Sequence, residues 1–340
     1  MTENLTRPQV TFGPADMADH LSRLRQAAPE LHACVDPQRA RTWAHELARS
    51  GHIEDDFADD TDGGRGTSYL RAQARNLSAR AQGIGHLLSL VPAGTQRRPA
   101  VVVDVLGGDG LVRRVAKARN LTGLSVLTCD ASPYMVRAAW AADCPALVQR
   151  ADRLLVRDGC VDAVLVAYGS HHIAPEDRAE LAHEAYRVLR PGGVLLLHDF
   201  LVGSPMDTWF RDVVHPYSRT GHAFDHFTRE EISGYLTKAG FEWAEVSDMA
   251  DPYVATAATA REAELEVGRY LLDMYGLAEI ERLHPADADH HTIERAKAIF
   301  RQERADGSLE TACVEYDGSA GTWKCTVPRV AVLGVGRKAD

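Results

Sequence analysis

The sequence predicts an α/β fold built around a parallel sheet, and the first observation is a strand that ends in glycines. Residues 101–110 (VVVDVLGGDG) run from an apolar segment into Gly107, Gly108 and Gly110, and a helix over 111–118 (LVRRVAKA) follows. Glycines at that point let backbone N–H groups approach a ligand that any Cβ would push away. Such a strand–loop–helix unit is typical of a nucleotide-binding sheet.

The following residues repeat the alternation of strand and helix. A second apolar run, 124–130 (LSVLTCD), ends at Asp130, where an acidic side chain can hydrogen-bond a ribose diol. Asp162 then leads into a strand over 163–167, a helix over 178–193 ends in Pro-Gly-Gly, and the strand VLLLHDF comes next. This order predicts a parallel sheet with helices on its faces.

Together these segments resemble the class I S-adenosylmethionine-dependent methyltransferases over about residues 98–250, which implies a Rossmann-like methyltransferase sheet. The resemblance implies that Asp130 grips the ribose of the cofactor and that Asp152, before the fourth strand, reads the adenine edge. It assigns the methionine part of the cofactor to the first loop, with the residues Asp104, Gly107, Gly108 and Gly110. Two positions depart from the family pattern: Leu106 stands in place of its first glycine, and Asp109 in place of a common Thr or Ser.

A dinucleotide cofactor fits this loop less well for a physical reason. Its pyrophosphate would be repelled by Asp109 in the middle of the loop. S-adenosylmethionine carries a sulfonium cation and an ammonium group instead, which acidic residues at 104 and 109 suit.

Composition places further limits on the function. The chain has 340 residues, of which 45% are hydrophobic, and a net charge of −10. That charge argues against nucleic acid or an anionic membrane as a partner, because both need a positive surface. Apolar runs stay short of the ~18 residues that span a bilayer, and the first residues lack a signal-peptide pattern. Six scattered cysteines without CxxC spacing indicate reduced thiols. We therefore expect a cytoplasmic enzyme with a small-molecule substrate.

The flanking regions predict two additions to a core over 98–250. Helical patterns within 1–97 predict an N-terminal helical cap, which in this family usually forms a lid over the cofactor and one wall of the substrate pocket. A helical insertion is expected over 251–312, because the strand near 243–249 should pair with one in 313–340 that completes the sheet. Such an insertion caps the pocket or forms a subunit interface. A homodimer is expected from its apolar residues, which include Leu265, Tyr270, Leu271, Met274 and Tyr275.

Histidines gather where catalytic groups of open α/β sheets lie, beyond the carboxyl ends of the strands. Three places carry them: His171 with His172 after the fourth strand, His198 with Asp199 at the end of the fifth, and His222 with His226 in a later loop. That loop precedes a helix for which Thr228 and Glu231 predict a capping box. A histidine pair after the fourth strand also lines the pocket of methyltransferases that bind no metal. Only one of His198 and Asp199 can face the site, since side chains alternate along a strand. His226 has an alternative role as a hydrogen-bonded structural residue.

Two of these patches resemble the α-keto acid C-methyltransferases of antibiotic biosynthesis. Gly169-Ser170-His171-His172 precedes Pro175-Glu176, and Gly221-His222 precedes the capped helix. The resemblance implies that His171 and His222 hold a divalent or ferric metal ion, although His172 stands where that family has an acid and Ala223 follows His222. A carbon beside a ketone must lose a proton before methylation, and a metal that chelates the keto and carboxylate oxygens stabilises the enolate. His172 is the candidate base.

A carboxylate substrate also needs a cationic partner. The segment YLRAQARNLSARAQG offers Arg71, Arg75 and Arg80, and we expect Arg75 to take part in the reaction. A solvated helix face is the alternative for these arginines.

The sequence thus predicts C-methylation of a small α-keto acid at its β-carbon in secondary metabolism. Two alternatives remain open. One is a metal-free O- or N-methyltransferase with His171 or His172 as a general base, and the other is a methyltransferase fold that acts as a pericyclase or scaffold without methyl transfer.

Overall fold

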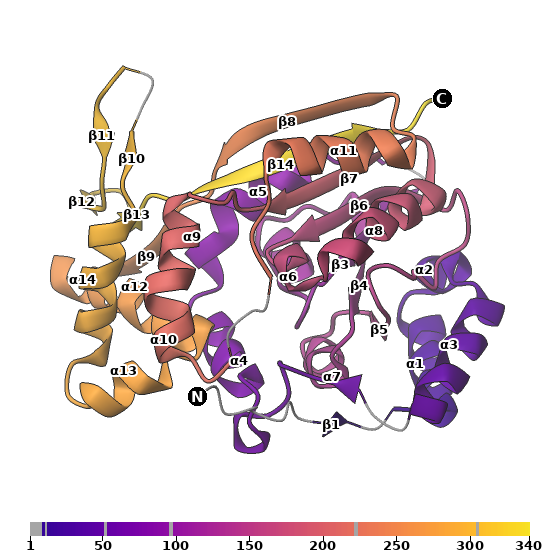
Figure 1. The fold of residues 1–340 in the computed structure, drawn as a ribbon, viewed down its shortest axis with the longest axis horizontal. Helices are drawn as coiled ribbons and strands as arrows, with labels where there is room; N and C mark the ends of the chain where they lie inside the picture. Colours follow the sequence, from indigo (N-terminus) through magenta and orange to yellow (C-terminus); the bar gives the residue numbers. More distant parts are fainter. Residues whose placement is uncertain (1–8, 11, 51–52, 95–97, 221–223, 304–305) are drawn as a thin grey trace.

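A mixed sheet flanked by helices forms the centre of the protein (Figure 1). The computed structural model describes residues 9–340 except 11, 51–52, 95–97, 221–223 and 304–305. Within these residues the sheet has the order β5–β4–β3–β6–β7–β14–β8, and β14 alone runs antiparallel to both of its neighbours. Its strands are β3 (Ala100–Val105), β4 (Leu124–Asp130), β5 (Ala146–Val148), β6 (Val161–Ala167), β7 (Leu189–Asp199), β8 (Trp243–Ala250) and β14 (Val330–Arg337). The predicted α/β class with a mostly parallel sheet is confirmed.

Continuous apolar runs explain why the central strands lie inside. Every residue of β3 is buried, as is nearly all of β6, since a parallel strand covered on both faces needs apolar side chains at every position. One face packs against α5 (Ala81–Ser89) and α6 (Leu111–Ala118). The other packs against α7 (Pro133–Ala141), α8 (Pro175–Val188) and α11 (Arg229–Ala239).

The first three helices cover the β4–β5 edge of the sheet. Glu30 on α2 accepts a hydrogen bond of 2.7 Å from the Ser125 hydroxyl, and Val35 forms a bridge with Val156. These N-terminal helices contribute no residue to the cavity described below, whereas residues 55–84 do. A lid role for 1–97 stays a prediction, and the residues of this region that line the cavity lie within 55–84. The N-terminal elements are β1 (Gln9–Val10), α1 (Pro14–Ala27), α2 (Pro29–Cys34), α3 (Pro37–Ser50), β2 (Ile53–Glu54), η1 (Asp60–Asp62), α4 (Gly66–Arg75) and η2 (Leu77–Arg80).

The segment between β8 and β14 forms a lobe at the left of Figure 1. It is not purely helical, because β12, β13 and β9 form a small antiparallel sheet beside the helices. Residues 313–327 therefore belong to this lobe, and only β14 completes the main sheet, which moves the boundary expected at 313. The lobe consists of β9 (Tyr253–Ala257), α12 (Ala260–Tyr275), α13 (Ala278–Leu283), α14 (Ala288–Ile299), β10 (Gln302–Glu303), β11 (Leu309–Glu310), β12 (Cys313–Asp317) and β13 (Thr322–Val327).

Most apolar residues that suggested a homodimer are buried within this single chain. Tyr270, Leu271, Met274 and Tyr275 on α12 share a core with Trp209 and Phe300. Their burial removes the argument for a second copy that rested on them.

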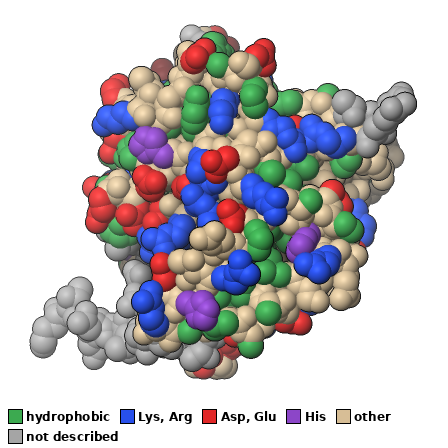
Figure 2. Space-filling model, turned by 90° about the vertical axis from the view of Figure 1, so that its right-hand side faces the viewer, with side chains coloured by type: hydrophobic (Ala, Val, Ile, Leu, Met, Phe, Trp, Pro, Cys, Tyr) green, Lys and Arg blue, Asp and Glu red, His purple; other side chains and the backbone are tan. Residues whose placement is uncertain are grey.

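The remaining elements connect the sheet to the lobe. They are η3 (Ser170–His172), α9 (Pro205–Trp209), η4 (Phe210–Val214) and α10 (His215–Tyr217). Of the helices in the described ranges, none has the length and apolar content that crossing a membrane requires. On the face shown in Figure 2, Lys and Arg side chains are interspersed with Asp and Glu side chains.

Candidate active site

A cavity of about 390 Å³ lies where the carboxyl ends of β3, β4 and β6 meet the helical lobe. Its wall includes the glycine loop, the loops after β4, β5 and β6, residues 55–84 and the end of α12, as well as Phe200, Phe210 and Arg329. Acidic residues on this wall are Asp55, Asp56, Asp104, Asp130, Asp152 and Asp177, and its cations are Arg65, Arg80, Arg150 and Arg329. A ligand here would thus meet both acidic groups and arginines.

The backbone of the glycine loop keeps a left-handed turn at Leu106, although a leucine stands there in place of a glycine. Leu106 has a φ of 59°, in the left-handed region where glycine is usual, and Gly108 follows with a φ of 56°. A Cβ on Gly107 would lie 2.5 Å from Oδ2 of Asp104. The loop keeps its tight path with a leucine at the first position, so that Gly107 and Gly108 remain on the cavity wall.

Two residues of the loop have roles other than the expected contact with the cofactor. Gly110 is the N-cap of α6, where a Cβ would lie 2.6 Å from Cβ of Cys144, and it does not line the cavity. Asp109 forms an ion pair with Arg114 and is likewise absent from the cavity wall. Gly110 therefore shapes the start of the helix, and the charge of Asp109 is already balanced.

Asp104 and Asp130 are the carboxylates at the strand ends. Oδ2 of Asp104 is buried and accepts no hydrogen bond from the described residues. Burial, followed by the charges of Asp130 and Asp109, raises the pKa of Asp104 well above its usual range. Asp130 accepts backbone hydrogen bonds of 2.9 Å from Gly108 and from Ser132, yet burial raises its pKa to about 6. Both carboxylates are held at the cavity by the ends of β3 and β4.

Asp152 also lines the cavity, but it already has a cationic neighbour. Nε of Arg150 donates a hydrogen bond of 2.8 Å to it, and the same guanidinium reaches Asp177 at 3.0 Å. An adenine contact at Asp152 therefore stays a prediction, with Arg150 as part of the same surface.

His171 is oriented by a buried carboxylate. Nδ1 of His171 lies 2.9 Å from Oδ1 of Asp199, and the backbone N–H of His171 donates to Oδ2 of Asp199 at 2.9 Å. Although burial alone would raise the pKa of Asp199, the adjacent His171 and His226 hold it well below its usual range. His198 points the opposite way, toward Asp251 at 3.1 Å. Of the neighbouring residues His198 and Asp199 on β7, it is therefore Asp199 that points toward His171.

His226, for which the sequence allowed either a site role or a structural role, lies next to His171 and Asp199. Ligand-capable atoms of His171, Asp199 and His226 lie within 4.8 Å of one another, and all three residues are buried. Asp207 orients His226 through a contact of 2.8 Å at Nδ1. Burial, and then the proximity of His171, lowers the pKa of His226, so that its imidazole is neutral near pH 7. His222 lies outside the described residues. The predicted capping box of Thr228 and Glu231, which follows this loop, is confirmed.

His172 is half-buried on the cavity wall. Its ring centroid lies 4.5 Å from that of His171 and 6.0 Å from that of Phe57. The cavity therefore contains a second imidazole beside the oriented one.

The arginines of the site differ from those expected. Arg71 and Arg75 both pair with Asp273, at 2.9 and 3.6 Å, and their side chains are 51% and 40% exposed. Neither lines the cavity, so the role expected for Arg75 lacks a structural basis. Arg80 does line it, is 5% exposed, and donates to the Tyr69 hydroxyl at 3.2 Å.

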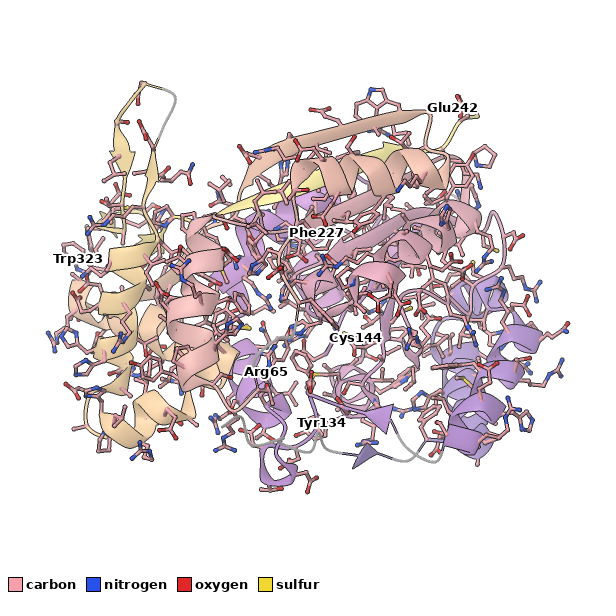
Figure 3. The ribbon with its side chains drawn as sticks, viewed as in Figure 1. Arg65, Tyr134, Cys144, Phe227, Glu242 and Trp323 are labelled. Carbon is pink, nitrogen blue, oxygen red and sulfur yellow. The ribbon has the colours of Figure 1, made fainter. Side chains whose placement is uncertain are left out.

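Arg65 was not among the expected site residues, because it directly follows the acidic, glycine-containing segment 54–64, in which no local pattern indicates burial. The structure buries it to 8% exposure, where it donates to the backbone oxygen of Met274 at 2.8 Å and stacks over Phe57. Figure 3 shows Arg65 between the helical lobe and the core. No carboxylate of the described residues forms an ion pair with Arg65 or Arg80. Burying a cation without an ion-pair partner costs free energy, and a bound anion would offset that cost.

Comparisons with known proteins agree with this geometry. Residues 103–197 match a sequence family described as a methyltransferase domain. A ubiquinone/menaquinone biosynthesis C-methyltransferase of Hydrogenovibrio crunogenus is 26% identical over 182 residues, which cover 46% of this chain and 70% of that protein. An uncharacterized methyltransferase of Mycobacterium tuberculosis is 38% identical over 161 residues, which cover 45% of this chain and 60% of the relative.

Solved structures include phosphoethanolamine N-methyltransferase 2 of Haemonchus contortus in complex with S-adenosyl-L-methionine. It has 19% sequence identity and a TM-score of 0.48, over 83% of this chain and 58% of that one. The YcgJ protein of Bacillus subtilis has 15% identity and a TM-score of 0.45, over 76% of this chain and 99% of that one.

The glycine loop, the acidic strand ends and the matched residues define a class I methyltransferase domain. Residues 103–197 are thus the methyltransferase domain of an enzyme that uses S-adenosylmethionine.

Proposed function

We propose that this methyltransferase C-methylates the β-carbon of a small α-keto acid in secondary metabolism, assisted by a divalent or ferric ion beside His171. The observation that carries the proposal is the buried group of His171, Asp199 and His226, of which His171 lines the same cavity as Arg65 and Arg80. Imidazole and carboxylate ligands suit such ions, and buried arginines suit a carboxylate. His222, which lies outside the described residues, remains a candidate ligand.

The residues expected to hold the cofactor are Asp104, Gly107, Gly108, Asp130 and Asp152. The buried Oδ2 of Asp104 supports this, because an ammonium group would provide the hydrogen bond that the described residues do not. Asp130 offers a carboxylate for a ribose diol at the next strand end. S-adenosylmethionine supplies an electrophilic methyl group on its sulfonium.

Proton transfer is assigned to the imidazoles. Because the ionised Asp199 accepts from Nδ1 of His171, the proton of His171 is held at that nitrogen and Nε2 carries the lone pair. A metal ion bound to neutral imidazoles would act as a Lewis acid on the keto and carboxylate oxygens. His172, on the same wall, then accepts the β-proton.

The substrate end of the cavity is aromatic and cationic. Phe57, Tyr69, Tyr168, Phe200, Phe210 and Tyr275 line it together with the buried arginines. An acid that carries an aromatic or large apolar side chain fits both features. The C-methyltransferase of Hydrogenovibrio crunogenus adds support for carbon as the acceptor atom.

A metal-free O- or N-methyltransferase is the second candidate, and the His171–Asp199 pair specifically favours it. A histidine oriented by a buried carboxylate is also the usual arrangement of a general base. A pericyclase or scaffold that binds cofactor without methyl transfer is the third.

A panel of α-keto acids, phenols and amines, assayed for S-adenosylhomocysteine with and without chelator, separates the three candidates. The proposal expects chelator to abolish turnover and an added divalent or ferric ion to restore it. It expects His171→Ala and His226→Ala to abolish turnover, with the affinity for S-adenosylmethionine near wild type. Full activity of the metal-free protein would exclude the metal-assisted reaction and support the metal-free O- or N-methyltransferase. Absence of S-adenosylhomocysteine with every acceptor would leave the third candidate.

A further inference from the structure

A second group of metal-ligating side chains lies in the helical lobe, away from the cavity. His284 follows α13, Asp287 is the N-cap of α14, and His291 lies one turn into α14. Their ligand-capable atoms all lie within 4.8 Å of one another. None of the three lines the cavity.

The two imidazoles are already close together. The ring centroids of His284 and His291 are 3.6 Å apart with an interplanar angle of 25°, and Nε2 of His291 lies 3.4 Å from Oδ2 of Asp287. Zn–N bonds of about 2.0–2.1 Å in a tetrahedral site place neighbouring ligand atoms about 3.4 Å apart. Small side-chain rotations would therefore suffice to form a site.

The backbone fixes the positions from which these side chains extend. The N–H of His284 donates to the oxygen of Ile280 at 2.8 Å, which ends α13. The N–H of His291 donates to the oxygen of Asp287 at 3.0 Å, so that these two ligands are one helical turn apart on the same face of α14. Sites built on helix ends keep their geometry better than sites on loops.

The neighbouring polar side chains have other partners or lie farther away. Asp289, the other carboxylate of this segment, pairs with Nε of Arg269 at 2.8 Å and holds α14 against α12. The ring of His290 is 6.2 Å from that of His291. Among the described residues, the cluster thus consists of His284, Asp287 and His291.

The geometry points to a transition-metal site formed by His284, Asp287 and His291, which clips α13 to α14. Two imidazoles and one carboxylate select Zn²⁺, Co²⁺, Ni²⁺ or Cu²⁺ over Mg²⁺ and Ca²⁺, which prefer oxygen ligands. The site is partly exposed, and water completes the coordination. Binding stabilises the lobe by mass action, because the unfolded chain does not hold the three ligands together.

The clip acts close to the cavity wall. Tyr275, which lines the cavity, is separated from α13 by only Gly276 and Leu277. A metal that fixes α13 would thus also fix the end of α12, without contact with the reacting groups.

The test is a titration of the full-length protein with Zn²⁺ alone, against a chromophoric chelator as competitor. The variants are His291→Ala and Asp287→Asn, with His290→Ala as the matched control. All carry Cys313→Ser, since an exposed thiol is itself a candidate zinc ligand and would add to the background. We expect the two ligand variants to lose one equivalent of bound Zn²⁺ and at least about 10-fold in affinity at this site, while the control retains both.

Thermal unfolding provides the second readout. Zn²⁺ is expected to raise the melting temperature of the parent protein and of His290→Ala, but by less in His291→Ala. A variant with His226→Ala distinguishes this site from the proposed active-site metal, because it should keep the His291-dependent equivalent whether or not the enzyme uses a metal. Equal stoichiometry and affinity in His291→Ala and His290→Ala would overturn the inference.

Discussion

Arg329 and Asp251 form a buried ion pair at the junction between the core sheet and the helical lobe. Nη2 of Arg329 lies 2.5 Å from Oδ2 of Asp251, and the Asp251 N–H donates to the Arg329 oxygen at 2.8 Å. Asp251 follows β8 and Arg329 precedes β14, so that the pair joins the two points at which the chain leaves and re-enters the sheet. Tyr253 also accepts a hydrogen bond of 2.7 Å from Arg329.

Breaking this pair should be costly. Asp251→Asn or Arg329→Met leaves a buried charge without its partner, which costs about 3–5 kcal/mol of unfolding free energy. Urea denaturation measures it. The control is Arg229→Ala, whose partner is Asp248 at 2.5 Å with side chains 39% and 59% exposed, and it should cost less than about 1 kcal/mol. Similar losses for both pairs would refute the special role of the junction.

Asp130→Asn should weaken binding of S-adenosylmethionine by about 10- to 100-fold, because a charged acceptor is lost while the side-chain shape is kept. Isothermal titration calorimetry measures the affinity, with the exposed Asp19→Asn as a control. Unchanged affinity would mean that Asp130 does not hold the cofactor.

The same substitution has an opposite effect on stability. Burial raises the pKa of Asp130 to about 6, above the ordinary value of about 3.9. A carboxyl with a raised folded-state pKa loses stability as pH rises through that interval, since the unfolded chain ionises first. The cofactor-free Asp130→Asn protein should therefore melt at a higher temperature than wild type at pH 8, with little difference below pH 4. Equal melting temperatures at pH 8 would contradict this.

Gly108→Ala and Gly110→Ala should separate cofactor binding from folding. Both glycines have positive φ, so alanine adds about 1–2 kcal/mol of backbone strain at either position. Only Gly110→Ala also forces a Cβ to within 2.6 Å of Cys144. We expect Gly110→Ala to be the less stable protein by thermal unfolding and Gly108→Ala to show the larger loss of cofactor affinity in proportion to its stability. The reverse order would show that Gly110 contacts the ligand.

Arg65→Met should raise KM for a carboxylate substrate by at least about 10-fold, since a charge-assisted hydrogen bond is lost. Arg75→Ala should leave KM unchanged, because Arg75 pairs with Asp273 outside the cavity. Steady-state kinetics with the best acid of the keto-acid panel compares them. A larger effect at Arg75 would restore the assignment expected from sequence.

The core of the fold was predictable because its signals are local. The apolar strand before Gly107 and the acidic end at Asp130 each follow from neighbouring residues, and the structure keeps both. Arg65 was not predictable, because its burial depends on Met274, which lies far along the chain in the lobe. His226 likewise acquires a role only when β6, β7 and the loop after α10 meet. Contacts between distant parts of the chain, and not the local sequence pattern, determine which of the many arginines and histidines lie at the site.

The antiparallel pairing of β14 with β8 has a consequence for the length of the segment between them. The lobe leaves β8 and returns on the neighbouring β14, so its two ends are adjacent. For the main sheet, the 79 residues between these strands (251–329) are equivalent to a long hairpin loop. The free energy of closing such a loop grows only slowly with its length. Lengthening or trimming the lobe at a surface loop should therefore cost the main sheet little free energy of loop closure.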